Sequence, residues 1–275
     1  MDTTVSSLAI VLPYDTAVIE RKFGQCEFYL PIQGGYGLVD FIAPWVVRKS
    51  IEYLDEKDRA EKLMEVQVLL KMNGKHFVKL YDYYTTCFEG LNVIFLFLER
   101  VDYCLIDLLY DGQTLYSRSQ VFDIVDQILL GLEILHGEGH VHRDIKPDNL
   151  GIKESNGKLI VKILDLGLVA RVGERVYDNN LPWNRVLKDD NRIASYLDDL
   201  YSVGVILQQL LINTNTDQQE TKCVNMMNNV VERACELGDA VIYASASHMR
   251  QHLKQVWNNN QEYYYTPNIY FDEQF

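Results

Sequence analysis

The chain has 275 residues, of which 48% are hydrophobic, and its formal net charge at pH 7 is −13. A chain of this length buries about three quarters of the surface that its unfolded form exposes, which allows two lobes around one cleft but not several independent domains. The negative charge argues against non-specific nucleic-acid binding and is compatible with basic protein partners, and no apolar run approaches the length of a membrane span.

The first hundred residues predict strands arranged around one helix. After a lead-in of residues 1–24, the stretch Ile32–Val39 contains three glycines, and the β-branched run Val46–Lys49 follows closely. Both are predicted to be strands of one sheet. A helix is predicted at Asp55–Met72, which is acidic in its first turn, and the apolar run Val93–Leu98 predicts a buried strand.

The middle of the chain predicts a buried helix followed by a hairpin. Ser119–Leu135 repeats apolar residues every three or four positions, and Ser117 or Ser119 can cap its start. The short runs Leu150–Lys153 and Leu159–Leu164 are predicted strands, because a turn sequence that ends in Asn-Gly joins them.

The last third of the chain predicts further helices and a polar tail. The helices are expected at Lys222–Leu237 and Asp239–Trp257, and the tyrosine-rich tail begins at Asn258. His248 and His252 are four residues apart on the last helix. Because no third ligand is evident, they favour ordinary surface residues over a zinc site.

The segment between the buried helix and the hairpin carries the strongest chemical signal. Residues 142–150 read His-Arg-Asp-Ile-Lys-Pro-Asp-Asn-Leu, which places the carboxylate of Asp144 five residues before the carboxamide of Asn149. Another carboxylate, Asp165, follows the second strand of the hairpin. Such a group suits holding Mg²⁺ against a triphosphate while a hydroxyl loses its proton. The alternative is a surface loop that happens to be rich in charge.

These segments and their order resemble the eukaryotic-type protein kinase family, of the serine/threonine type. The resemblance covers about Tyr29 to Leu211. It implies an α+β fold with two lobes: a small, mostly antiparallel β lobe with one helix at about 25–99, and a larger helical lobe at about 100–258. A C-terminal tail at 259–275 completes a kinase domain that is expected to begin at residue 25.

The resemblance implies a catalytic role for each polar residue of these segments. Asp144 is expected to accept or orient the proton of the substrate hydroxyl. Lys146 is expected to neutralise the transferring phosphoryl group, and a lysine at this place is typical of Ser/Thr kinases. Asn149 and Asp165 are expected to hold Mg²⁺.

The resemblance also implies the residues that position ATP. Lys49 is expected to bind the phosphates and to be held by Glu65. Lys49 fits this role better than its neighbour, because Val47 then takes the small apolar position two residues before the lysine. Arg48 is a rival for this role, but it is expected to point to solvent. The stretch Asp199–Leu207 matches the family's central helix in the large lobe. Asp199 is expected to tie to that helix the backbone of residues 142–150, which we call the catalytic loop.

The remaining nucleotide contacts are expected from glycines and from the junction of the two lobes. Glycines let backbone amides approach phosphate oxygens, although a hairpin turn would explain this stretch equally well, and Ile32 stands where the family has its first glycine. At the junction, Leu98 is expected to guard the back of the pocket. The expected contacts are Gly34, Gly35, Gly37, Val39, Glu99 and Val101.

The chain departs from the family pattern after Asp165. No Ala-Pro-Glu occurs, with Leu181-Pro182-Trp183 as the nearest proline site, and there is no serine or threonine from Leu166 to Ala194. The pattern around Asp165–Arg171 is most similar to the casein kinase one group, which also lacks that tripeptide. Gly151 stands where a leucine supports the adenine in the family, so weaker nucleotide binding is expected.

The expected function is transfer of the γ-phosphoryl group of ATP, with Mg²⁺, to serine or threonine of a protein substrate. Two alternatives stay open: a pseudokinase that binds nucleotide or acts as a scaffold, and a small-molecule phosphotransferase. No nucleic-acid or membrane partner is expected, and the oligomeric state is left open. The five cysteines show no metal-binding spacing, and Met1–Leu12 lacks the basic start of a secretory signal, which favours a reducing cytoplasmic or nuclear compartment.

Activity is expected not to depend on phosphorylation of the segment Leu166–Ala194. In this segment only Tyr177 could take a phosphate. Without one, Arg143 is expected to pair with a fixed carboxylate such as Glu174 or Asp178, or to stay unpaired. Treatment with a broad phosphatase and, separately, Tyr177→Phe should each leave phosphoryl transfer unchanged. A large loss in both experiments would contradict this expectation, and a loss with phosphatase alone would indicate a phosphorylated residue elsewhere.

Overall fold

The structure is a computed structural model that describes residues 32–34, 37–72, 74, 76–88, 90–110, 116–176, 193–214, 220–235 and 243–261. Several expectations fall outside these residues. They concern the lead-in 1–24, Gly35, Tyr177, Asp178, Leu181–Trp183 and the tail beyond Gln261.

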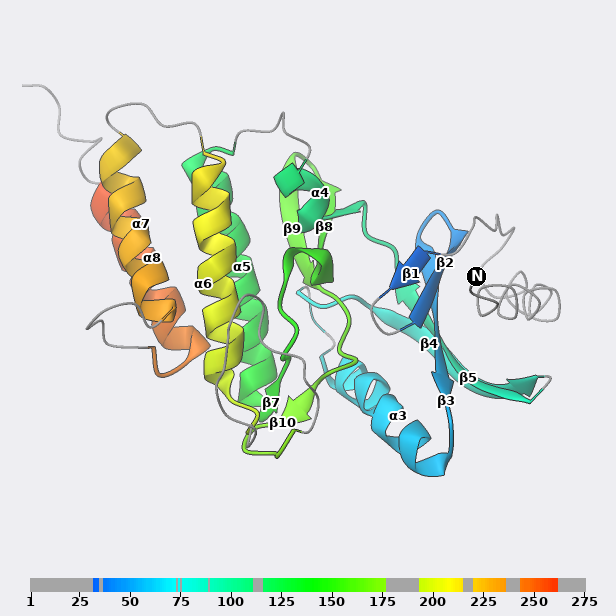
Figure 1. The fold of residues 1–275 in the computed structure, drawn as a ribbon. Helices are drawn as coiled ribbons and strands as arrows, with labels where there is room; N and C mark the ends of the chain where they lie inside the picture. The colour runs from blue at the N-terminus through cyan, green and yellow to red at the C-terminus, as the bar shows by residue number, and fades with distance from the viewer. Residues whose placement is uncertain are drawn as a thin grey trace, which may run out of the picture.

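The small lobe, as far as the structure describes it, is an antiparallel sheet with one helix (Figure 1). Its five strands lie in the order β1-β2-β3-β5-β4. The elements are β1 (Ile32–Gly34), β2 (Gly37–Ala43), β3 (Val46–Tyr53), α3 (Glu56–Lys71), β4 (Leu80–Phe88) and β5 (Leu91–Glu99).

Helix α3 forms and stops where the sequence predicts. The Asp55 side chain caps it by accepting from the backbone N–H groups of Lys57 and Asp58, and acidic residues occupy the first turn. On the face turned to the sheet, Glu65 and Leu69 are buried. The helix therefore holds the Glu65 carboxylate inside the core of the small lobe.

The large lobe consists mainly of helices with short strands near the small lobe (Figure 1). Its helices are α4 (Leu105–Tyr110), α5 (Arg118–Gly137), α6 (Tyr196–Ile212), α7 (Glu220–Ala234) and α8 (Ala246–Gln261). Its shorter elements are β6 (Tyr103–Cys104), β7 (His140–Val141), the 3₁₀ turn η1 (Pro147–Asn149), β8 (Leu150–Ser155), β9 (Lys158–Ile163) and β10 (Ala170–Arg171). The two-lobed α+β kinase fold expected from the sequence is confirmed.

Helix α5 is the central support of the large lobe. Ser117 and Gln120 form a reciprocal capping box at its start, which confirms one of the two predicted caps. The predicted apolar stripe is fully buried. Gly131 lets the helix approach β9 closely, since an added Cβ would lie only 2.6 Å from Cδ1 of Ile163. The hairpin that leads to Asp165 is thus packed directly on a rigid helix.

The β8–β9 hairpin has a two-residue turn. Asn156 has φ 51° and Gly157 has φ 73°, and Ser155 pairs with Lys158 across the turn. Both central residues are left-handed, as the type I′ hairpin turn requires, and Asn-Gly is the sequence that best accepts it. The strands begin and end within two residues of the predicted bounds.

The C-terminal helices differ from the prediction. Helix α8 begins at Ala246 rather than Asp239, because Ser245 accepts from the backbone N–H of His248 and so caps the helix. It runs on to Gln261, past the expected end at Trp257, whose ring stacks on Phe122 of α5. The predicted tail therefore begins inside a helix.

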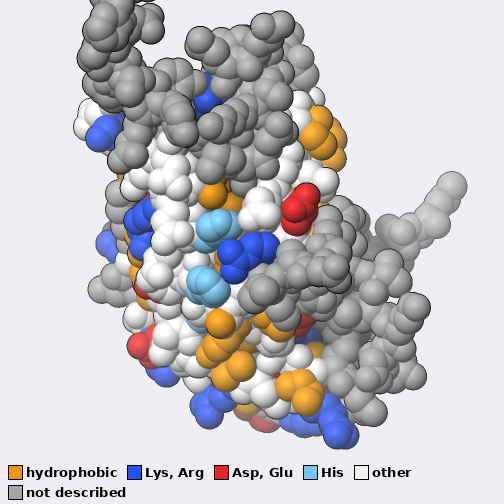
Figure 2. Space-filling view, turned by 90° about the vertical axis from the view of Figure 1, so that its left-hand side faces the viewer, with side chains coloured by type: hydrophobic (Ala, Val, Ile, Leu, Met, Phe, Trp, Pro, Cys, Tyr) orange, Lys and Arg blue, Asp and Glu red, His pale blue; other side chains and the backbone are white. Residues whose placement is uncertain are grey.

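The two histidines of α8 have structural contacts. His248 and His252 both pack against the ring of Tyr243, and Arg233 of α7 lies over the same ring at 4.5 Å. Figure 2 shows this end of the large lobe, where histidine and basic side chains lie close together. None of the described helices is long and apolar enough to cross a membrane.

The expectation that Arg48 points to solvent is wrong. Successive side chains of a strand lie on opposite faces, so Arg48 and Lys49 diverge. The face that receives Arg48 is buried rather than wet, and only 1% of the residue is exposed. Its guanidinium donates to the carboxylate of Asp40 at 3.0 and 3.2 Å and lies over the ring of Phe95 at 4.7 Å. Arg48 therefore stabilises the outer face of the small lobe.

Arg48→Met is expected to destabilise the fold, because it leaves the Asp40 carboxylate buried without this partner. Removing one partner of a buried ion pair costs about 3 kcal/mol or more. Urea unfolding would measure the loss, with Lys57→Met at an exposed position of α3 as the control. A loss as small as that of the control would show that the pair contributes nothing.

Candidate active site

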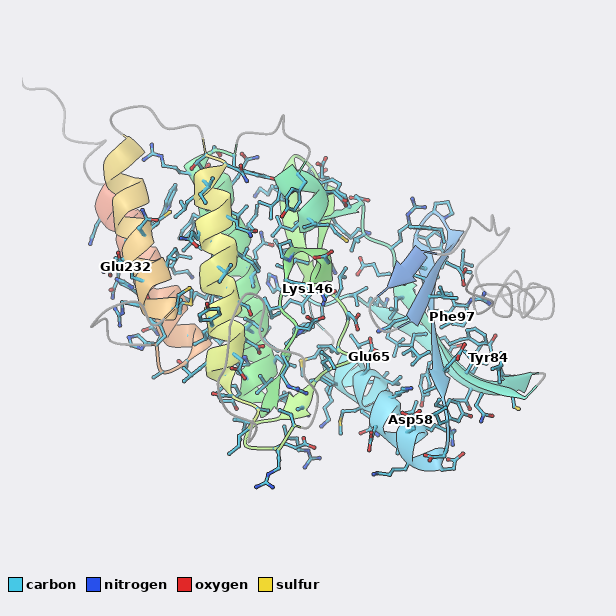
Figure 3. The ribbon with its side chains drawn as sticks, in the orientation of Figure 1. Asp58, Glu65, Tyr84, Phe97, Lys146 and Glu232 are labelled. Carbon is cyan, nitrogen blue, oxygen red and sulfur yellow. The ribbon has the colours of Figure 1, made fainter. Side chains whose placement is uncertain are left out.

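The site is organised around the ammonium group of Lys49. Its Nζ lies 2.8 and 2.9 Å from the two carboxylate oxygens of Glu65 on α3 and 2.7 Å from Oδ1 of Asp165 beyond β9. The expected contact between Lys49 and Glu65 is present, and Asp165 adds an ion pair that crosses from one lobe to the other. Figure 3 shows Glu65 and Lys146 on the facing sides of the two lobes.

Two carboxylates share this one ammonium. Burial acts to lower the pKa of Lys49, but Glu65 and Asp165 outweigh burial and hold this pKa above its ordinary value. Burial raises the pKa of Glu65, and the nearby Asp165 carboxylate adds to the rise. Burial also acts to raise the pKa of Asp165, yet the Lys49 ammonium holds it below the ordinary value. Counted at formal charges, two carboxylates and one ammonium leave one excess negative charge, which a cation can neutralise.

Asp199 fixes the backbone of the catalytic loop, as expected. Its carboxylate accepts from the backbone N–H of His142 at 2.9 Å and of Arg143 at 2.8 Å, and it lies 2.9 Å from Nε2 of His136. Its side chain is fully buried. Burial acts to raise the pKa of Asp199, but the hydrogen bond and charge of His136 hold it below the ordinary value.

His142 joins the catalytic loop to the segment that carries Asp165. Its Nε2 lies 2.9 Å from the carbonyl oxygen of Leu164, which can only accept, so Nε2 carries the proton. Its Nδ1 is then free to accept from the backbone N–H of Asp144 at 3.2 Å. One imidazole thus connects both carboxylate-bearing segments.

Two residues of the site adopt left-handed backbone conformations without being glycine. Arg143 has φ 70° and Asp165 has φ 46°. Each such conformation costs of order 1–3 kcal/mol and persists only where the surroundings enforce it. The Asp199 carboxylate holds the first, and the bond from the Gly167 N–H to Asp165 Oδ1 at 3.1 Å helps to hold the second.

Asp144, Lys146 and Asn149 form one hydrogen-bonded group. Oδ2 of Asp144 accepts from Nζ of Lys146 and from Nδ2 of Asn149, both at 2.8 Å. Nδ2 of Asn149 also donates to the backbone carbonyl of Asp144 at 2.8 Å. The fold therefore brings together three side chains that the sequence spreads over residues 144–149. Oδ1 of Asp144 accepts none of these bonds.

The donor set fits a hard cation such as Mg²⁺. Because the amide nitrogen of Asn149 is used by Asp144, its oxygen remains to bind a metal, and Asp165 offers a carboxylate. Mg²⁺ in phosphate sites takes one or two carboxylates together with phosphate oxygens and water. Within the described residues no group of three or more His, Cys, Asp or Glu could hold a metal ion. A metal at this site would therefore need phosphate oxygens or water as further ligands.

The strands of the small lobe place the remaining candidates beside Lys49. Val39 pairs directly with Lys49 across β2 and β3, and Val47 packs on the main core. Gly34 and Gly37 pair with each other at the β1–β2 end of the sheet. The expected glycine stretch is thus a hairpin next to the lysine strand.

The junction of the lobes runs from Glu99 to Val101. The backbone N–H of Val101 has no hydrogen-bond acceptor among the described residues, so it is available to a ligand. The side chain of Val101 also fills the space beside Gly151, where an added Cβ would lie 2.6 Å from its Cγ1. The Val101 side chain therefore occupies the space that a side chain at position 151 would take.

Sequence reasoning missed three partners and misplaced a fourth. His136 and its bond to Asp199 gave no signal, because the residue lies within the apolar pattern of α5. The lysines that bind Glu99, Lys153 and Lys162, were not singled out either. Glu174 does not pair with Arg143 but accepts from the backbone N–H of Arg171.

The chain is similar to known proteins. A model of the protein kinase domain matches residues 41–268, which is most of the chain. The chain belongs to the protein kinase family. Its relatives include cyclin-dependent kinase F-3 of Oryza sativa subsp. japonica, which is 31% identical over 169 residues covering 60% of this chain and 37% of the relative.

Two other relatives carry different kinase names. A Wee1-like protein kinase of Arabidopsis thaliana is 30% identical over 182 residues, covering 63% of this chain and 34% of the relative. A serine/threonine-protein kinase ICK of Mus musculus is 32% identical over 153 residues, covering 54% and 23%. The chain thus spans well under two thirds of the length of each relative named here. The casein kinase one assignment stays a prediction.

Asp199→Asn is expected to weaken the anchoring of the loop backbone, because a carboxamide offers only one acceptor oxygen and leaves one of the two N–H groups, that of His142 or of Arg143, without its acceptor. A buried group left unsatisfied costs about 1–3 kcal/mol. Hydrogen exchange of these two amides should accelerate, whereas exposed Asp123→Asn on α5 should not change them.

The stability lost in Asp199→Asn should depend on pH. The folded-state pKa of Asp199 is lowered, so its contribution is fully present above the unfolded pKa of about 4 and is lost as the pH falls through the folded value. Equal exchange in the parent and the variant at neutral pH would contradict the anchoring role.

Proposed function

We propose that the protein transfers the γ-phosphoryl group of ATP to a serine or threonine of a protein substrate, with Mg²⁺. The observation that carries the proposal is the Lys49 ammonium held between Glu65 and Asp165. It would be difficult to explain as a stability device alone, because two carboxylates in contact with one ammonium leave an uncompensated negative charge in a nearly buried place.

The small lobe and the junction are proposed to bind ATP. Lys49 would contact the phosphates through its ammonium, and Glu65 would hold the lysine in that direction. The backbone near Gly34 and Gly37 would cover the phosphates, with Gly35 between them. The base would lie against Val39, Val47 and Val101, with the backbone of Glu99 and Val101 offering hydrogen bonds.

The large lobe is proposed to position the hydroxyl and the charge. Asp144 would accept the hydroxyl proton at Oδ1, which the Lys146 and Asn149 bonds leave open. Lys146 would release part of its hold on Asp144 to contact the transferring phosphoryl group. Asp165 and the amide oxygen of Asn149 would hold Mg²⁺, which supplies charge neutralisation when bound.

The substrate class follows from weaker features. Lys146 supports a serine or threonine acceptor, and the net charge of −13 supports basic protein substrates.

The kinase domain is proposed to extend from about residue 25 to the C-terminal tail. Cys87 and Cys104, which form no disulfide among the described residues, support a reducing cytoplasmic or nuclear compartment.

The direct test is incubation with labelled ATP, Mg²⁺ and a panel of basic and acidic proteins. Asp144→Asn should lower the rate by about 10²–10⁴ through loss of the proton acceptor, with ATP binding nearly unchanged. Lys49→Met should lower it about 10²-fold or more by removing charge stabilisation at the phosphates.

The controls separate the alternatives. Arg48→Met should keep the rate per folded molecule, because its guanidinium lies on the other face of the sheet. ATP binding without transfer to any protein or small acceptor would indicate a pseudokinase, and transfer only to small hydroxyl compounds would indicate a small-molecule phosphotransferase. Near-parental turnover of Asp144→Asn would show that the catalytic site is assigned wrongly.

A further inference from the structure

A second ion cluster lies behind the junction of the lobes. The carboxylate of Glu99, the last residue of β5, is 2.9 Å from Nζ of Lys162 on β9 and 3.3 Å from Nζ of Lys153 on β8. It also accepts from the backbone N–H of Lys79 at 3.3 Å. We call Glu99, Lys153 and Lys162 the hinge latch.

The hinge latch joins three segments that are distant in sequence. Nζ of Lys162 also donates to the carbonyl oxygen of Phe77, between α3 and β4, at 3.4 Å. Nζ of Lys153 also donates to the carbonyl oxygen of Arg100 at 3.3 Å. Each lysine therefore binds the Glu99 carboxylate and one backbone carbonyl, so that the latch holds main chain as well as side chains.

Backbone bonds close the same junction beside the latch. The N–H of Ile163 donates to the carbonyl oxygen of His76 at 2.8 Å, and the N–H of Val78 donates to that of Ile163 at 3.1 Å. The segment that follows α3 is thus paired with the end of β9. A movement of one of these segments must carry the others with it.

The latch is partly buried, and its ion pairs favour the charged form of Glu99. The side chains of Glu99 and Lys162 are only 13% and 11% exposed, whereas that of Lys153 is 31% exposed. Burial acts to raise the pKa of Glu99, but the Lys162 hydrogen bond and charge outweigh it and hold the pKa below its ordinary value. Lys162 is accordingly the stronger partner of the two.

The segments joined by the latch are those that deliver the side chains of the site. Lys162, near the end of β9, precedes Asp165 by three residues, and the segment at Phe77 follows the helix that bears Glu65. The ion pair between Glu99 and Lys162 is present in the same structure in which Lys49 contacts the carboxylates of Glu65 and Asp165. The two arrangements are therefore compatible, and neither must open for the other to form.

We infer that Glu99 and Lys162 are positioning residues, which act through the junction to hold α3 and β9 in the register that brings Glu65 and Asp165 to Lys49. As far as it concerns catalysis, this inference rests on the proposed function. It assigns the Glu99 side chain a task separate from the nucleotide contacts proposed for its backbone.

Kinetics with Lys162→Met, Glu99→Gln and the double variant test the inference. Because a hydrogen bond to a charged group is at stake, each single variant should lower kcat/KM for ATP about tenfold. The double variant should lose little more than either single one, since the two residues act as a pair. Lys162→Arg should restore most of the loss, and Lys158→Met, at an exposed position of the same hairpin, should have no effect.

Each result has a defined meaning. A turnover in Lys162→Met above that of the parent would show that the latch restrains the enzyme and would overturn the inference. So would additive losses in the double variant or a loss equal to that of Lys158→Met. Thermal unfolding of each variant identifies any loss that comes only from an unfolded fraction.

A readout without catalysis separates this inference from the proposed function. Hydrogen exchange of the Val78 and Ile163 amides should be faster in Lys162→Met than in Lys158→Met, with the amides of α5 unchanged. If the parent transfers no phosphoryl group, the proposed function fails while this comparison still tests the latch. Equal exchange in the two variants would show that the latch does not hold the junction.

Discussion

One ammonium group, that of Lys49, connects the two lobes of this protein. It is held from one side by a carboxylate on α3 and from the other by the carboxylate that follows β9. A buried charge of this kind is tolerated only when its partners are placed accurately. The rest of the structure can be understood as the means by which three separate segments are brought to one point.

Each of these segments is held by a rigid element. Strand β3 is central in its sheet, and its neighbouring side chain Arg48 is fixed on the opposite face by Asp40. The catalytic loop is bound to α6 through Asp199, which also enforces the left-handed conformation of Arg143. Strand β9 lies directly on α5 at Gly131. Reactive side chains on irregular segments are thus supported by helices and strands, as functional loops generally are.

The sequence predicted those features that depend on local pattern. The apolar stripe of α5, its serine cap and the Asn-Gly turn of the hairpin are local signals, and the spacing from Asp144 to Asn149 indicated a family. Arg48 was misjudged because alternation along a strand shows which face a residue occupies but not whether that face is covered. Lys162 gave no signal, since its partner Glu99 is far away in sequence, and the start of α8 depended on a single serine cap at Ser245.

The most direct measurement of the central claim is the Mg²⁺ dependence of ATP binding in the parent and in Asp165→Asn, followed by calorimetry. If Asp165 and Lys49 form one Mg²⁺–nucleotide site, Mg²⁺ should strengthen ATP binding to the parent and should have little effect on the variant, while both proteins unfold at similar temperatures. ATP binding to the parent that does not respond to Mg²⁺, or an equal response in the variant, would contradict the account.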